Sequence, residues 1–189
     1  MLTETNLQTY LTKVNLASPE VSLLFLKEIQ SAHVATFPFS SIAVLLKQDL
    51  SLDSEKLFER VILNERGGYC FEMNKIFFEL LTLIGFDCEL TLARVLNNRD
   101  IDAPRTHRVT RVRLNNLIYL VDVGCGGNCP REPLLLSTDE PQTQRDVVYK
   151  ITQPREHDYL LQMEKGNQWF TLYTFDDYHY TDADCSCGQ

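Results

Sequence analysis

The spacing of apolar residues changes near Gly85, and this change limits the folds that the chain can form. Before Gly85, apolar residues recur every three or four positions, as on one face of a helix, and after it they alternate as in strands. Helices and strands are therefore segregated along the chain, which is typical of an α+β fold with an antiparallel sheet. We expect a helical half followed by an antiparallel β half.

Three segments of the helical half carry start or stop signals. Ser-Pro-Glu at 18–20 combines a capping hydroxyl, a proline and an early acid, which predicts a helix start there. Asp53 or Ser54 can cap a further amphipathic helix. A third helix is predicted to begin at Cys70 and to stop at Gly85, a residue suited to a helix C-terminus.

Turn signals divide the β half into hairpins. Asn-Asn at 115–116 separates apolar runs at 107–114 and 117–123, and indicates a two-residue turn because Asn tolerates positive φ. Gly-Asn at 166–167 is a second such signal. Further strands are expected at 90–95, 147–152, 159–164 and 169–175. The acidic, tyrosine-rich end at 176–189 has no period and is predicted to be loop.

The composition excludes several classes of function. A chain that is 44% hydrophobic and 23% charged is typical of globular proteins rather than disordered ones. It has 18 Lys and Arg against 26 Asp and Glu, a formal net charge of −8, which argues against nucleic-acid or anionic-membrane partners. No targeting signal or membrane-spanning stretch is visible, so we expect a cytoplasmic protein with reduced cysteines.

Cys70 has the local surroundings of a reactive thiol. It follows Gly67 and Gly68 and begins a long apolar helix. Unpaired N–H groups and the positive end of the helix dipole favour a thiolate there, and the same groups can receive an oxyanion during acyl transfer. The alternative is that Cys70 is a small buried apolar residue, as most free cysteines are.

The register of the first hairpin brings His107 and Asp122 together. If the two asparagines form the turn, Leu114 faces Leu117, and the pairing extends to His107 opposite Gly124. Asp122 then projects from the same face as His107, as its diagonal neighbour. A carboxylate on one ring nitrogen fixes the tautomer and leaves the other nitrogen to serve a thiol. Alternatively, Asp122 caps a turn and His107 lies at the surface; a one-residue slip would separate the two.

Three motifs resemble those of a known enzyme family. Arg-Gly-Gly-Tyr-Cys-Phe-Glu-Met-Asn at 66–74 resembles the nucleophile motif of the arylamine N-acetyltransferases. His-Arg-Val at 107–109 and Asp-Val-Gly-Cys-Gly at 122–126 resemble that family's histidine and aspartate motifs, in the same order. Two shorter segments also match in position, Phe-Pro-Phe at 37–39 and Ile-Gly-Phe at 84–86.

The resemblance implies a cysteine-peptidase-like core with a defined division of the chain. An N-terminal helical domain, 1–86, would carry the nucleophile cysteine. An antiparallel β-barrel domain, 87–175, would carry the histidine and the aspartate, and the acidic tail would occupy 176–189.

The resemblance also implies the reaction. An acetyl group would pass from acetyl-CoA, the acyl-donor substrate, to an aromatic amine or hydrazine through a thioester on Cys70, with no metal. His107 would act as base and then acid, and Asp122 would orient it. The implied substrate-binding residues are Phe39, Arg66, Gly124 and Gly126.

Two departures from the family pattern bear on these expectations. Ser-Ser at 40–41 stands where the family has Glu-Asn, so Arg66 lacks that acid and should pair with Glu65 or Glu72, or face solvent. The family's C-terminal third domain, which lies over the barrel, has no counterpart in this sequence. We expect an exposed apolar surface there, covered by a homodimer partner or by the tail tyrosines.

Two further groups of residues invite an interpretation. Six arginines lie in a span with only two acids, Asp100 and Asp102, and can form a site for coenzyme phosphates or, as we favour, a solvated outer face. They are Arg94, Arg99, Arg105, Arg108, Arg111 and Arg113. The spacings of Cys125 with Cys129 and of Cys185 with Cys187 are not those of zinc knuckles, so we expect no metal there and two exposed tail thiols.

Two alternatives to the acetyltransferase stay open at this level. The first is a thiol-dependent hydrolase or amide-forming transferase with a different acyl donor. The second is a catalytically impaired relative that serves as an interaction module.

Overall fold

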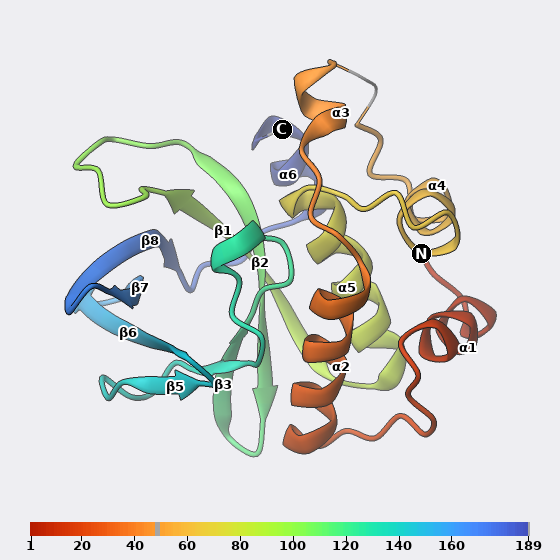
Figure 1. Ribbon diagram of the computed structural model, residues 1–189, viewed down its shortest axis with the longest axis horizontal. Helices are drawn as coiled ribbons and strands as arrows, with labels where there is room; N and C mark the ends of the chain where they lie inside the picture. The colour runs from red at the N-terminus through yellow and green to blue at the C-terminus, as the bar shows by residue number, and fades with distance from the viewer. Residues whose placement is uncertain (48–49, 189) are drawn as a thin grey trace.

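The protein consists of helices packed on one side of a curved antiparallel sheet (Figure 1). The computed structural model describes residues 1–47 and 50–188, and the burial of their side chains as far as Cys185. The helices are α1 (Glu4–Lys13), α2 (Leu23–Thr36), α3 (Ile42–Leu45), α4 (Ser54–Leu57), α5 (Cys70–Ile84) and α6 (Asp182–Gly188), with a π-helical turn at Phe58–Leu63.

Eight strands form one nearly closed barrel, with the order β4-β3-β2-β1-β8-β7-β6-β5. Their bounds are β1 (Asp87–Val95), β2 (Arg105–Leu114), β3 (Leu117–Val121), β4 (Leu134–Leu135), β5 (Gln142–Gln144), β6 (Val147–Arg155), β7 (Asp158–Lys165) and β8 (Gln168–Asp176). The sequence-based expectation of an α+β fold, with helices before an antiparallel barrel, is confirmed. The division into two domains at residue 86 stays a prediction.

The two predicted hairpin turns are present. Asn115 and Asn116 have φ values of 52° and 63°, and Leu114 pairs with Leu117 as expected. Gly166 and Asn167 also have positive φ, between β7 and β8. Positive φ at both central residues matches the twist of the flanking strands, which explains why these dipeptides mark the turns.

The largest buried cluster joins the helices to the sheet. It combines apolar residues of α1, α2 and α5 with residues of β2 and β3. Along β3, Tyr119 and Val121 face the helices, whereas Leu120 packs in a second cluster inside the barrel. Both faces of this strand are therefore buried, and the alternation of side chains assigns neighbouring residues to different cores.

Several predicted boundaries differ from the observed ones, and two of them have a clear physical cause. The second helix begins at Leu23 rather than near 18–20, because the Ser22 hydroxyl accepts the N–H of Phe25 and so caps it. The strand expected at 117–123 ends at Val121, because the Asp122 carboxylate accepts the N–H of Gly124 and turns the backbone.

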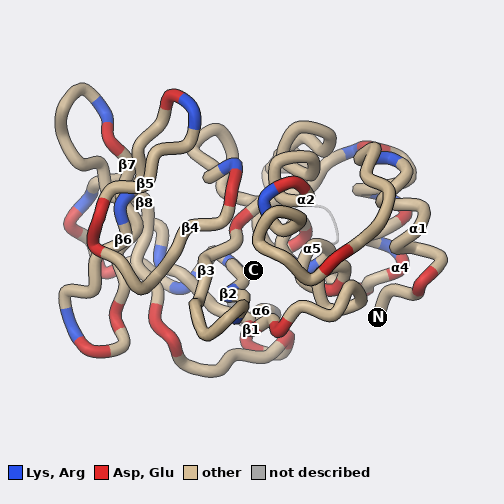
Figure 2. The backbone as a smooth tube through the Cα atoms, turned by 90° about the horizontal axis from the view of Figure 1, so that it is seen from below, with Lys and Arg blue, Asp and Glu red and all other residues tan. Residues whose placement is uncertain are grey.

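The C-terminal segment is not the loop that we expected. Residues 182–188 form α6, which lies beside the first turns of α5 (Figure 1). Figure 2 shows α6 between the strands and the other helices. Asp182 pairs with Lys75 at 2.6 Å and with Arg108 at 2.6 Å, and Cys185 is fully buried beside Phe71. Local patterns do not predict this helix, because Lys75 and Arg108, with which it pairs, lie far away along the chain.

Of the two tail tyrosines expected to cover an apolar surface, one packs against the fold and the other is exposed. Tyr180 packs against the small cluster that holds Cys185, and its hydroxyl donates to Asp176 at 2.8 Å. Tyr178 is 57% exposed. The homodimer stays a prediction. In the described part of the chain, no helix has the length and apolar character needed to cross a bilayer.

Replacing the α6 carboxylate should destabilise the fold. Arg108 is 1% exposed, so Asp182→Asn leaves a buried guanidinium with a neutral partner. Breaking a fully buried pair costs about 3–5 kcal/mol. The Asp182 side chain is 56% exposed, so we expect about 1–2 kcal/mol, measured by urea unfolding. The exposed Asp139→Asn is the matched control, and equal stability of the two variants would contradict the contribution of α6.

Candidate active site

Cys70 is held at the start of α5 by a tightly packed loop. Gly67 has a φ of 68°, and a Cβ there would lie 2.1 Å from the Pro38 carbonyl oxygen, so only glycine fits. Ser40 donates its backbone N–H to the carbonyl of Gly68 at 2.9 Å, which ties this loop to the segment after α2.

A buried acid completes the loop. The Glu72 side chain is 1% exposed, accepts the backbone N–H of Tyr69 at 3.0 Å, and pairs with Arg60. This interaction fixes the residue before Cys70 and neutralises the carboxylate. Arg66, for which Glu72 was one expected partner, is exposed, and Glu65 pairs with Lys13 at 2.6 Å. The expectation that Arg66 can face solvent therefore holds.

The structure brings Cys70, His107 and Asp122 into one chain of contacts. The His107 Nε2 atom lies 2.7 Å from the Asp122 carboxylate, and the Cys70 thiol, which donates to the Thr106 carbonyl at 3.5 Å, lies near enough to His107 to raise its pKa. Nε2 is engaged by Asp122, which leaves Nδ1 as the ring nitrogen for the thiol. The paired ladder of β2 and β3 ends at Thr110 and Val121, yet the diagonal approach predicted from the register is present.

The charges of this group stabilise one another. Burial alone would lower the pKa of His107, but the charge and hydrogen bond of Asp122, with a smaller contribution from Cys70, raise it well above 6.5. Burial alone would raise the pKa of Asp122, but His107 and the donors Asn74 and Gly124 hold it below its usual value. Each of the two groups therefore favours the charged form of the other.

The Asp122 carboxylate accepts four hydrogen bonds from the described residues. Its Oδ1 atom accepts from the Asn74 side chain at 3.0 Å and from the Gly124 N–H at 2.8 Å. Its Oδ2 atom accepts from the Tyr173 hydroxyl at 3.0 Å as well as from His107. These donors compensate the burial of the charge and fix the orientation of the carboxylate.

Sequence reasoning missed Asn74 and Tyr173. Asn74 lies four residues after Cys70, one turn along the same face of α5, so its spacing was an available signal. Tyr173 packs its ring on His107 with centroids 5.0 Å apart. It reaches the site because β8 pairs with β1, and no local pattern predicts that pairing.

A cavity of about 190 Å³ opens beside Cys70. Its lining is mostly apolar and aromatic, with the thiol and the imidazole on one wall: Phe39, Cys70, Val95, Asn97, His107, Gly124, Cys125, Asn128, Leu172 and Tyr173. The predicted substrate-binding residues Phe39 and Gly124 are in this lining. Gly126 lies next to the Phe39 ring, and a Cβ there would be 3.5 Å from it. Arg66 is outside the lining.

Gly124 allows the barrel to approach the helix. A Cβ at this position would lie 2.8 Å from the Cys70 Cα atom and 2.7 Å from the Asn74 side chain. A larger residue would push the loop after β3 away from α5. The close contact therefore sets the distance between the thiol and its two partners.

Neither interpretation of the six arginines describes all of them. Arg108 and Arg111 are 1% and 5% exposed, so they do not belong to a solvated outer face. Four arginines instead pair with acids: Arg105 with Asp176, Arg108 with Asp182, Arg111 with Glu89, and Arg113 with Asp87. Acids from distant segments thus neutralise charges that look unbalanced along the sequence.

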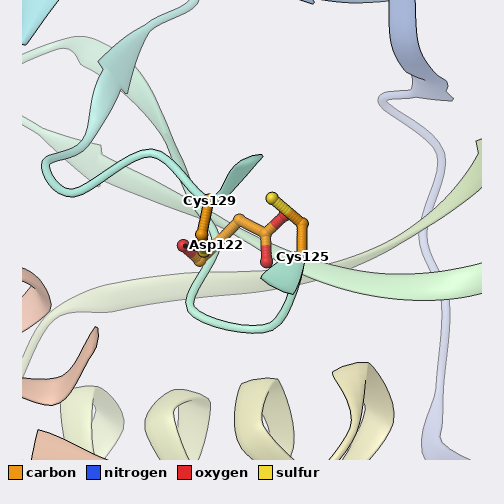
Figure 3. A group of neighbouring side chains, drawn as sticks. All are labelled: Asp122, Cys125 and Cys129. Carbon is orange, nitrogen blue, oxygen red and sulfur yellow. Dashed lines mark hydrogen bonds between the residues drawn. The ribbon is translucent and has the colours of Figure 1, made fainter. Parts of the chain in front are cut away.

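Asp122 also belongs to a group with metal-ligand chemistry, together with two cysteines of the loop that follows it. Oxygen of Asp122 and sulfur of Cys125 and Cys129 all lie within 4.8 Å of one another (Figure 3). The hydrogen bond with Cys129, together with burial, raises the pKa of Cys125 well above its usual value. Cys185 is buried rather than exposed as we expected, and the side chain of Cys187 lies outside the described residues.

The chain is similar to known proteins in sequence. A family model described as N-acetyltransferase matches residues 22–188. The arylamine N-acetyltransferase of Escherichia coli K12 is 34% identical over 172 residues. The match covers 90% of this chain and 61% of that protein, so the chain spans about three fifths of this curated relative.

The fold is similar to that of solved structures. The arylamine N-acetyltransferase of Salmonella typhimurium superposes with a TM-score of 0.92 at 30% identity, over 100% of this chain and 69% of that one. The Mycobacterium marinum arylamine N-acetyltransferase in complex with CoA has a TM-score of 0.88 at 30% identity, over 96% and 69%. By sequence and by fold, the chain belongs to the arylamine N-acetyltransferase family.

Proposed function

We propose that the protein transfers an acetyl group from acetyl-CoA to an aromatic amine or hydrazine through a thioester on Cys70. The observation that carries this proposal is the chain of contacts from Cys70 through His107 to Asp122. A thiol served by an imidazole that a carboxylate orients is the arrangement needed for nucleophilic acyl transfer. Membership of the family supports the acetyl group and the amine as substrates.

In the first half of the reaction the enzyme takes up the acetyl group. The sulfur of Cys70, its proton held by His107, attacks the thioester carbonyl of the donor. The carbon–sulfur bond to the coenzyme breaks, and His107 returns the proton to the leaving thiolate. Backbone N–H groups at the start of α5 face the oxyanion that forms.

In the second half the acceptor amine attacks the acetyl group on Cys70. His107 takes a proton from the nitrogen as the new amide bond forms, and the sulfur leaves. Asp122 keeps the imidazole oriented and stabilises its positive charge in both halves. Tyr173 and Asn74 act through Asp122 as positioning residues.

The cavity supports an aromatic acceptor. A dry apolar cavity of about 150 Å³ holds one benzene ring. The cavity beside Cys70 has about 190 Å³ and includes the rings of Phe39 and Tyr173. A single aromatic ring therefore fits, with its amine directed toward the thiol. The donor is supported by the related Mycobacterium marinum structure, which contains CoA.

Incubation with acetyl-CoA should leave one acetyl group on Cys70. We expect intact-protein mass spectrometry to show one acetyl adduct, which an arylamine removes and which Cys70→Ala lacks. Cys88→Ser is the matched control, because it removes a thiol of β1 that lies outside the cavity, and it should still be labelled.

Other outcomes identify the alternatives. Loss of the adduct in buffer as fast as with an arylamine would indicate a thiol-dependent hydrolase. Labelling by another acyl donor alone would indicate a transferase with a different donor. A Cys70 that accepts no acyl group would indicate an interaction module and contradict the proposal.

The His107–Asp122 pair should make stability depend on pH. The folded pKa of His107 is raised above 6.5, so its contribution is full below about pH 6.5 and is lost as the pH rises through the raised pKa. The folded pKa of Asp122 is lowered below 3.8, so its contribution is present above that pH and is lost as the pH falls through the lowered value.

The free energy of unfolding, measured in urea over a pH series, tests this coupling. We expect the difference between wild type and His107→Gln to be largest between about pH 4 and pH 6.5 and to decrease above that range. A difference that does not change with pH would show that the pair is not ionised as described.

A further inference from the structure

The loop after β3 brings two thiols to one place. Residues Gly126–Asn128 form a single 3-10 turn, with Cys125 directly before it and Cys129 directly after it. The Cys129 N–H donates to the Gly126 carbonyl at 3.1 Å and closes the turn. Figure 3 shows both side chains directed toward Asp122, which follows β3.

We propose that Cys125, Cys129 and Asp122 bind one thiophilic divalent cation, such as Zn²⁺ or Cd²⁺. Their ligand atoms already lie within 4.8 Å of one another. Bond lengths of about 2.0–2.3 Å in a tetrahedral site place ligand atoms about 3.3–3.8 Å apart, so small side-chain movements complete the set. Two sulfur atoms with one carboxylate oxygen form a donor set that suits zinc-like ions.

The charges of the loop favour a cation. The Asp122 side chain is fully buried and negative, and its only ionic partner among the described residues is His107. On binding, each thiol releases one proton to solvent and forms one sulfur–metal bond, and the cation gives up water in exchange. Two thiolates, one carboxylate and a cation of charge +2 sum to −1, which is the charge that the carboxylate carries alone, so binding leaves the net charge of the site unchanged.

The site can be reached from two sides. Cys125 lines the cavity beside Cys70, and Cys129 lines a separate hollow of about 280 Å³ together with Gln144 and Tyr149. A cation can therefore enter from solvent, and a water molecule can fill its fourth position. The Cys129 thiol also donates to the Asp122 backbone carbonyl at 3.1 Å. This hydrogen bond holds the thiol close to Asp122.

Cation binding would act on the catalytic candidates through Asp122. Both carboxylate oxygens already accept two hydrogen bonds each, so an oxygen that binds the cation must give up one of these contacts. The site thus couples a soft metal ion to the orientation of His107. This inference goes beyond the acetyltransferase proposal and does not depend on it.

Cadmium titration tests the site without an activity assay. The reduced, chelator-washed full chain carries Cys70→Ser, so the nucleophile cannot bind the ion. We expect the cadmium–thiolate absorption band to saturate at one ion per chain, and Zn²⁺ to compete for the same site. Adding Cys129→Ser should weaken binding by at least about 10-fold, since loss even of an outer partner of a metal site costs that much.

Controls separate this site from other thiols. The Cys129→Ser hydroxyl can still donate to the Asp122 carbonyl, and thermal unfolding checks that the fold is kept. Cys88→Ser in the same background should leave the titration unchanged. A band that survives Cys129→Ser, or that Cys185→Ser removes instead, would overturn the proposal. So would a wild-type protein whose mass shows that Cys125 and Cys129 form a disulfide and bind no ion.

Discussion

The site and its surroundings depend on the hydrogen bonds that the buried carboxylate of Asp122 accepts. An isolated charge in the interior would be costly, and this one is tolerated because four donors from α5, β2, β8 and its own loop converge on it. The same donors join the helices to the barrel. Stability and chemistry therefore use one set of hydrogen bonds, and neither can change without affecting the other.

The proposed nucleophile and its partners come from different halves of the chain. Cys70 begins a helix, whereas His107 and Asp122 come from a hairpin, so their spacing depends on how closely the two halves pack. The absence of a side chain at Gly124 makes that approach possible. Glu72 and Gly67 fix the loop on the helical side. The geometry is thus held by packing at the junction rather than by any one element.

Much of this could be predicted from local patterns. The two hairpin turns, the helix from Cys70 to Gly85 and the proximity of His107 to Asp122 follow from Asn and Gly positions and from strand register. The ion pairs of Arg108 and Lys75 with α6 could not, because their acid lies far along the chain. Tyr173 was missed for the same reason. Local rules set the elements, and long-range pairing decides which polar side chains become buried together.

The pairing of β1 with β8 has a consequence for how the protein is made. Ala93 lies opposite Phe175, so the Tyr173 hydroxyl meets Asp122 only when strands distant in the sequence have found each other. Such contacts form late, since closing a long loop costs entropy before it gains any interaction. The β2–β3 hairpin and α5 can form earlier from nearby residues. A newly synthesised chain would then pass through a stage in which Asp122 lacks its Tyr173 donor, and its set of hydrogen bonds would be complete only when the last strand has paired.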